Sequence, residues 1–240
     1  MNSSASRQDL FALLAENPYP GRGILSGLTP DGKSAVTAYF IMGRSENSRN
    51  RIFCLRENGE VYTRAFDESK VADPSLILYN AVRYLPGCTI VTNGDQTDTI
   101  YTALKDGGRF EDALKTRCFE PDAPHFTPRI SLLQSFEPEY TYTLSLLKSE
   151  DASGTACSRY TYSYTPVAGL GHLIHTYAGD GNPLPSFSGE PVPVTTENDE
   201  EQFAVSLWNA LDAQNRISLF VQYTDLSTGR RTDRLIQSHI

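Results

Sequence analysis

The sequence predicts an α+β fold in which two mainly antiparallel sheets lie between layers of helices. Strand-like segments are joined by tight turns, and the helical segments come in blocks instead of alternating with single strands as in repeated βαβ units. No internal period indicates a repeat protein. With 240 residues, 39% of them hydrophobic, the chain can bury a sizeable core. We expect residues 1–240 to form a single domain.

The first part of the chain predicts one helix and two hairpins. Residues 6–16 carry leucines at helical spacing, with Ser6 as a candidate N-cap. Two pairs of strand-like segments then flank residues that favour tight turns, Thr29-Pro30-Asp31-Gly32 and Asn58-Gly59. The four expected strands are Gly23–Leu28, Ser34–Met42, Arg51–Glu57 and Glu60–Phe66.

The middle of the chain predicts three helices around one short strand. The run from Leu76 to Leu85 is long and lacks alternation, so we expect a largely buried helix there. Cys88–Thr92 is typical of a buried strand. A helix capped by Asp95 or Thr97 should follow and end near Gly107-Gly108, and Phe110–Cys118 should form another.

The last part predicts a loop, six strands and one helix. Three prolines within residues 120–128 rule out regular structure there, and residues 179–193 form a long Gly/Pro/Ser-rich connection. Asn198–Leu211 has the apolar spacing of an amphipathic helix. The expected strands are Arg129–Gln134, Tyr140–Lys148, Ser158–Thr165, Gly171–Tyr177, Ile217–Thr224 and Arg231–Gln237.

Charge and missing motifs exclude several classes of protein. A net charge of −8 argues against a nucleic-acid binder, and no apolar run reaches membrane-spanning length. The first residues lack the apolar core of a secretory signal, so we expect a cytoplasmic protein with no membrane contact. The four cysteines form no Cys-x-x-Cys pair, and His172 and His175 should point to opposite faces of a strand. We therefore expect no metal and no cofactor.

Positive charge gathers where one predicted strand ends. An apolar run stops at Met42, and three arginines follow within eight residues: Arg44, Arg49 and Arg51. Glu46 is the one acidic residue among them. Guanidinium groups match the oxygens of carboxylates and phosphates, so this loop could bind a small anion. The alternative is that the arginines are surface charges paired with the chain's many carboxylates.

Five segments in order make the chain similar to a known family. They are Asn17-Pro18-Tyr19-Pro20-Gly21-Arg22-Gly23, Gly43–Arg51, Leu78–Arg83, Thr92–Ile100 and Thr127-Pro128-Arg129-Ile130. This series resembles the archaeal-type inosine monophosphate (IMP) cyclohydrolase family and its bacterial relatives, well over residues 20–150 and weakly beyond. The resemblance implies a four-layer αββα fold like that of the N-terminal nucleophile hydrolases, without their self-processed nucleophile.

The resemblance also implies an activity and a substrate. Such an enzyme is a cyclohydrolase run in the ring-closing direction: it closes 5-formamidoimidazole-4-carboxamide ribotide to IMP with loss of water, in purine biosynthesis. The partner would be this purine ribotide, a 5′-monophosphate, and a homo-oligomer is compatible with the family. Two alternatives stay open: a non-catalytic protein that binds purine ribotides, and another amide hydrolase on the same fold.

By the same resemblance, three residues align with active-site positions. Arg49 would stabilise the developing oxyanion, Tyr79 would exchange a proton with the departing oxygen, and Glu120 would be the general base or orient the amide. Tyr79 could instead be a core aromatic and Glu120 a solvated loop carboxylate. The remaining candidates would bind substrate: Arg22, Arg44 and Arg51 at the phosphate, Asn93 and Asp98 at the ribose or base, and also Asn47 and Arg129.

Overall fold

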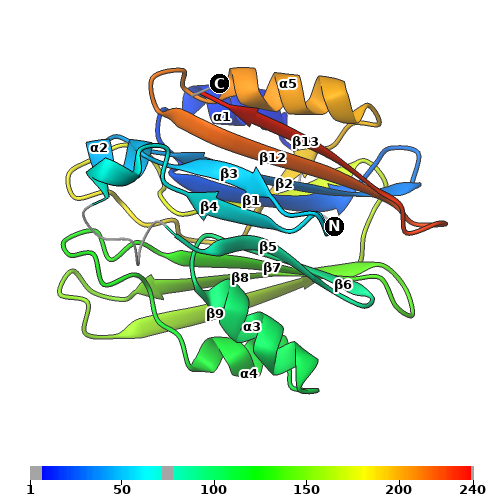
Figure 1. The fold of residues 1–240 in the computed structure, drawn as a ribbon, viewed down its shortest axis with the longest axis horizontal. Helices are drawn as coiled ribbons and strands as arrows, with labels where there is room; N and C mark the ends of the chain where they lie inside the picture. The colour runs from blue at the N-terminus through cyan, green and yellow to red at the C-terminus, as the bar shows by residue number, and fades with distance from the viewer. Residues whose placement is uncertain (1–6, 72–77, 239–240) are drawn as a thin grey trace, which may run out of the picture.

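The computed structural model describes residues 7–71 and 78–238, which form two antiparallel sheets stacked face to face with helices on both outer faces (Figure 1). The six-stranded sheet has the order β11-β10-β1-β2-β12-β13 and the seven-stranded sheet the order β3-β4-β5-β6-β7-β8-β9. The ladders between neighbouring strands are antiparallel. The predicted α+β class, with two antiparallel sheets between helical layers, is confirmed.

The strands and helices have the following bounds. The six-stranded sheet contains β1 (Arg22–Leu28), β2 (Ser34–Met42), β10 (Leu170–His175), β11 (Val192–Thr195), β12 (Arg216–Asp225) and β13 (Arg231–Gln237). The seven-stranded sheet contains β3 (Ile52–Leu55), β4 (Val61–Arg64), β5 (Asn80–Leu85), β6 (Cys88–Thr92), β7 (Arg129–Ser135), β8 (Thr141–Ser149) and β9 (Cys157–Tyr164). The α-helices are α1 (Leu10–Glu16), α2 (Glu46–Arg49), α3 (Gln96–Lys105), α4 (Phe110–Lys115) and α5 (Glu200–Ala210), and η1 (Glu68–Lys70) is a 3₁₀ turn.

Three apolar clusters hold these layers together. The largest lies between the sheets and contains Tyr39 of β2, while the neighbouring Phe40 points the other way, into the cluster under α1 and α5. This alternation is the period-two pattern of a strand buried on both faces. The third cluster packs α3 and α4 on the seven-stranded sheet through Ile100 and Phe110. The layers are therefore helix, sheet, sheet and helix.

One predicted helix is wrong. Residues 80–85 form strand β5, paired with β4 and β6 inside the seven-stranded sheet. Tyr84 packs against the cluster between the sheets, and its neighbour Leu85 packs against the cluster under α3 and α4, so both faces of the strand are covered. A strand covered on both faces shows no polar alternation, which is why the apolar run resembled a helix. Leu76 and Ile77 lie outside the described residues.

Smaller differences concern the ends of elements. Asp9 caps α1 by accepting hydrogen bonds from the Phe11 and Ala12 amides, whereas Ser6 lies outside the described residues. Asp95 precedes α3, but within the described chain its carboxylate makes no cap bond and instead pairs with Arg117 and Arg129. No helix in the described residues is both long enough and apolar enough to cross a membrane.

Candidate functional site

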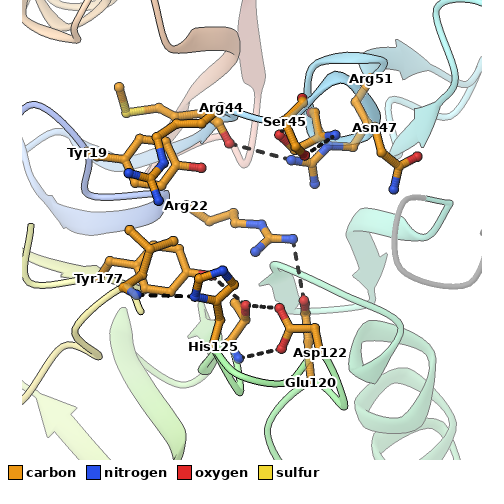
Figure 2. A pocket seen from close by; sticks show the side chains of 14 residues that line it. Tyr19, Arg22, Arg44, Ser45, Asn47, Arg51, Glu120, Asp122, His125 and Tyr177 are labelled. Carbon is orange, nitrogen blue, oxygen red and sulfur yellow. Dashed lines mark hydrogen bonds and ion pairs between the residues drawn. The ribbon is translucent and has the colours of Figure 1, made fainter. Parts of the chain in front are cut away.

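A cavity of about 290 Å³ lies at the end of the sandwich where β1 begins and β2 and β10 end. These three strands are antiparallel neighbours, so their ends meet at one edge. The loop before β7 supplies the opposite wall. Figure 2 shows the arginine loop on one side, Glu120, Asp122, His125 and Tyr177 on the other, and Arg22 between them.

The arginine loop, residues 43–51, is shaped by a glycine at its start and by the one-turn helix α2. A Cβ at Gly43 would come within 2.8 Å of the Ser48 backbone and 2.5 Å of its hydroxyl, so the chain can close tightly only with glycine there. Ser45 caps α2 by accepting a hydrogen bond from the Ser48 amide at 3.1 Å. This turn places Arg44, Asn47 and Arg51 on the cavity wall.

Arg51 is the largest fully buried side chain in the described residues, with 1% of its surface exposed. Its Nε donates to the Ser48 carbonyl at 2.8 Å and its Nη2 to the Met42 carbonyl at 3.5 Å. Its Nη1 has no hydrogen-bond partner in the described part of the chain. Burial lowers the pKa of Arg51, and the neighbouring Arg22 lowers it further. A buried donor without a partner is costly, so a ligand acceptor would stabilise it.

Arg22 and Glu120 form a buried ion pair across the cavity. The Arg22 Nη2 lies 3.5 Å from the Glu120 Oε2, and Glu120 is 3% exposed. Arg22 Nε likewise lacks a partner among the residues described. Burial raises the pKa of the Glu120 carboxyl, although Arg22, Arg129 and Arg51 pull it down. Burial lowers the pKa of Arg22, but attraction by Glu120 together with three neighbouring tyrosines raises it overall. The cavity lining thus carries three arginines against two carboxylates, Glu120 and Asp122.

The loop that carries Glu120 is closed by its own hydrogen bonds. The Glu120 amide donates to the Thr127 carbonyl at 2.8 Å, and the Thr127 amide donates to the Asp122 Oδ1 at 2.7 Å. His125 Nδ1 accepts from the Leu184 amide at 3.2 Å, which ties the loop to the segment after β10. The predicted irregular segment is therefore an ordered wall of the cavity.

Arg44 connects the cavity rim to residues 178–187. Its Nη1 pairs with the Asp180 carboxylate, and its Nη2 donates to the Gly181 carbonyl at 3.1 Å. The guanidinium also lies 4.7 Å above the centre of the Tyr19 ring. Because the Asp180 and Arg44 side chains are both partly exposed, this pair can exchange with an incoming anion at little cost.

The structure brings five of the predicted site residues to this cavity, namely Arg22, Arg44, Asn47, Arg51 and Glu120. Arg49 is not among the described residues that line it. Arg49 lies one turn away, in a surface hollow shared with Phe66, Asp67 and Lys70. Its Nε donates to the Arg44 carbonyl at 3.3 Å. The structure therefore does not place Arg49 beside Glu120.

Tyr79 is also absent from the described residues that line the cavity. It is 7% exposed, and its hydroxyl is 2.5 Å from that of Tyr39. Burial raises the pKa of Tyr79, while Arg51 and Arg22 lower it. The phenol is therefore within the electrostatic reach of both buried arginines.

The other three predicted residues make contacts within the protein. Asn93 is buried, and its amide group donates to the Pro128 carbonyl and accepts from the Ile130 amide. Arg129 binds Asp95 at 2.8 Å and Gln96 at 2.7 Å, and its charge acts on Glu120. Asp98 lies on α3 and pairs with Arg83 at 2.8 Å. Asn93 and Arg129 thus hold the start of β7 and support the Glu120 loop.

Sequence reasoning assigned no role to several residues of the cavity, among them Tyr19, Asp122, His125, Thr127 and Tyr177. Tyr19 and Thr127 fall inside segments that carry the family resemblance. Asp122 and His125 sit in a loop with three prolines, where no periodic pattern can indicate which side chains face inward.

A family model described as IMP cyclohydrolase-like protein matches residues 19–229, which include every residue that lines the cavity. The chain belongs to the IMP cyclohydrolase-like family. A curated relative from Methanopyrus kandleri, named IMP cyclohydrolase, is 29% identical over 193 residues, covering 75% of this chain and 95% of the relative. The resemblance to the IMP cyclohydrolase family that the five sequence segments indicated is confirmed.

Proposed function

We propose that this protein is an IMP cyclohydrolase, which closes 5-formamidoimidazole-4-carboxamide ribotide to IMP with loss of water. The observation that carries the proposal is the pair of buried guanidiniums, Arg22 and Arg51, beside the buried carboxylate of Glu120 in one cavity. Both arginines keep an N–H group without a partner in the described chain. The family membership and the name of the curated relative support the same reaction.

The reaction makes few demands beyond position and charge. A carboxamide nitrogen attacks a formyl carbon on the same ring, so the enzyme gains most by holding the two groups face to face. The formyl oxygen becomes negative as the bond forms and then leaves as water. The site must therefore offer donors to that oxygen and an acceptor for the proton of the attacking nitrogen.

We assign the two buried arginines to the developing oxyanion. The Nη1 of Arg51 and the Nε of Arg22 are preorganised donors, because backbone carbonyls and Glu120 already fix the rest of each guanidinium. Preorganised donors of this kind account for a large part of enzymatic rate enhancement. Glu120, whose pKa is raised by burial, can orient the carboxamide or take its proton.

The 5′-phosphate fits the outer part of the cavity. Arg44 and Asn47 line its rim, and the Arg44–Asp180 pair is partly exposed. A dianionic phosphate would compete well with a single surface carboxylate for this guanidinium. Such an arrangement leaves the deeper arginines for the reacting groups. We propose that the enzyme works in the cytoplasm on this ribotide.

The expectations for Arg49 and Tyr79 stay predictions. Tyr79 could act on the site through its hydrogen bond to Tyr39, or through the charges of Arg51 and Arg22. Arg49 could reach a phosphate at the rim, since Arg44 is five residues away on the same loop. Asn93, Asp98 and Arg129 remain candidates for substrate contacts only if the substrate extends beyond the cavity.

A cyclisation assay tests the proposal. Purified protein is mixed with the formamido ribotide, and the appearance of purine absorbance is followed against an enzyme-free control. We expect a rate proportional to protein concentration and a strong loss in the Glu120→Gln variant. Binding of IMP without turnover by the unaltered protein would instead support a non-catalytic ribotide-binding protein. Release of free ammonia or formate would indicate an amide hydrolase.

A further inference from the structure

A chain of hydrogen bonds joins three side chains of the cavity lining. The Tyr177 hydroxyl lies 2.5 Å from Thr127 Oγ1, and Thr127 Oγ1 donates to Asp122 Oδ2. All three residues line the cavity, and Figure 2 shows Tyr177 and Asp122 on the side that also carries Glu120. Tyr177 and Thr127 are buried, whereas Asp122 is partly exposed.

The direction of this chain follows from the number of protons. A carboxylate only accepts, and Asp122 receives both the amide proton and the hydroxyl proton of Thr127. With its own proton given to Asp122, Thr127 Oγ1 must accept from the Tyr177 hydroxyl. The phenol proton therefore points to Thr127. The remaining lone pair of the phenol oxygen is an acceptor for a substrate N–H group.

We propose that Tyr177 is a further catalytic residue, the acceptor of the proton lost by the carboxamide nitrogen, and that Thr127 and Asp122 are positioning residues that carry its own proton away. This inference rests on the proposed function. As the C–N bond forms, the C=O π electrons move onto the formyl oxygen. The N–H proton goes to Tyr177 Oη, the phenol proton to Thr127 Oγ1, and the Thr127 proton to Asp122 Oδ2.

Two features favour this relay over Glu120 as the base. Glu120 is paired with Arg22, and a proton taken up by its carboxylate would leave that buried guanidinium without its counter-charge, so Glu120 is suited to orienting the carboxamide. Asp122, being partly exposed, can pass the proton on to water. Burial raises the pKa of Tyr177 to about 12, but the phenol gains one proton as it loses another and never carries a full charge.

Paired substitutions at Thr127 test the relay. Thr127→Val keeps the shape of the buried side chain and removes the middle hydroxyl, whereas Thr127→Ser keeps the hydroxyl. Because a positioned acid–base group contributes roughly 10²–10⁴-fold, kcat should fall by about 10²-fold or more in the valine variant and stay within a few-fold of wild type in the serine variant. KM should change little in both. Thermal unfolding shows whether each variant folds.

Two further variants complete the test. Tyr177→Phe keeps the ring, which stacks on Tyr19, and should lose kcat to a similar extent. Tyr223→Phe is the matched control, because that hydroxyl binds the Glu197 carbonyl and Tyr223 is not among the described residues that line the cavity. If Thr127→Val does not fold, the comparison of these two tyrosine variants decides.

The outcomes separate the relay from the proposed function. If wild-type protein forms IMP but Thr127→Val matches Thr127→Ser in kcat, or Tyr177→Phe matches Tyr223→Phe, the relay is refuted and the proposed function stands. If wild-type protein forms no IMP, the proposed function fails and the relay fails with it. A double variant, Thr127→Val with Asp122→Asn, should lose no more kcat than the worse single variant, because both break one chain.

Discussion

Among the residues of the cavity, we expect the ion pair of Arg22 and Glu120 to contribute most to the free energy of unfolding of the protein. Coulomb's law gives about 5 kcal/mol of attraction for unit charges at their 3.5 Å separation with an effective dielectric constant of about 20. Burial offsets part of this, as the raised pKa of Glu120 shows. Glu120→Gln leaves Arg22, Arg51 and Arg129 facing a neutral group, so we expect the free energy of unfolding to fall by about 3–5 kcal/mol.

Arg22→Met should lower the free energy of unfolding by less than Glu120→Gln does, because Arg129 and Arg51 still compensate the Glu120 carboxylate. The double variant should cost at least about 2 kcal/mol less than the sum of the two single losses, since neither charge is then left without the other. Urea unfolding of the wild type and the three variants at pH 7 measures this coupling. Losses that add to within about 0.5 kcal/mol would refute a direct interaction between the two side chains.

Three other predictions follow from individual side chains. Arg51→Met should lower turnover by about 10²–10³-fold, and a larger loss in Arg49→Ala would return the oxyanion role to Arg49. Tyr79→Phe leaves the buried Tyr39 hydroxyl without this partner, so it should cost about 1 kcal/mol in urea unfolding and slow ring closure; unchanged kinetics would make Tyr79 a core aromatic. Burial lowers the pKa of His175 from 6.5 to about 4, so as the pH falls the unfolded chain is protonated before the folded one. The free energy of unfolding should therefore fall by roughly 3 kcal/mol as the pH drops through this range. His175→Gln should flatten that loss, and an identical pH dependence in both proteins would contradict it.

Much of the fold could be predicted because turn chemistry is local. Asn58-Gly59 indicated the β3–β4 hairpin, and the turn at Gly59 does have a positive φ of 82°. Strand β5 could not be recognised in this way. Its Tyr84 packs against the cluster between the sheets and its Leu85 against the cluster under α3 and α4, so the sequence pattern carries no sign of which face is buried.

The site was predictable in its charge and less so in its geometry. The cluster of arginines after β2 indicated an anion site, and Arg44 and Arg51 do line the cavity. Arg49 is the last residue of helix α2 and faces a different hollow from Arg44 and Arg51. This helix depends on the Ser45 cap, which residue spacing alone does not reveal. Tyr177 follows β10 of the six-stranded sheet and Thr127 precedes β7 of the seven-stranded sheet, so the stacking of the two sheets, not sequence proximity, brings them together.

A crystal structure with IMP bound tests the central claim most directly. We expect the purine ring in the cavity, with its six-membered ring in contact with Arg22, Arg51 and Tyr177 and its phosphate near Arg44. Nucleotide bound in the hollow of Arg49 and Lys70, with the cavity beside Glu120 filled only by water, would contradict the account.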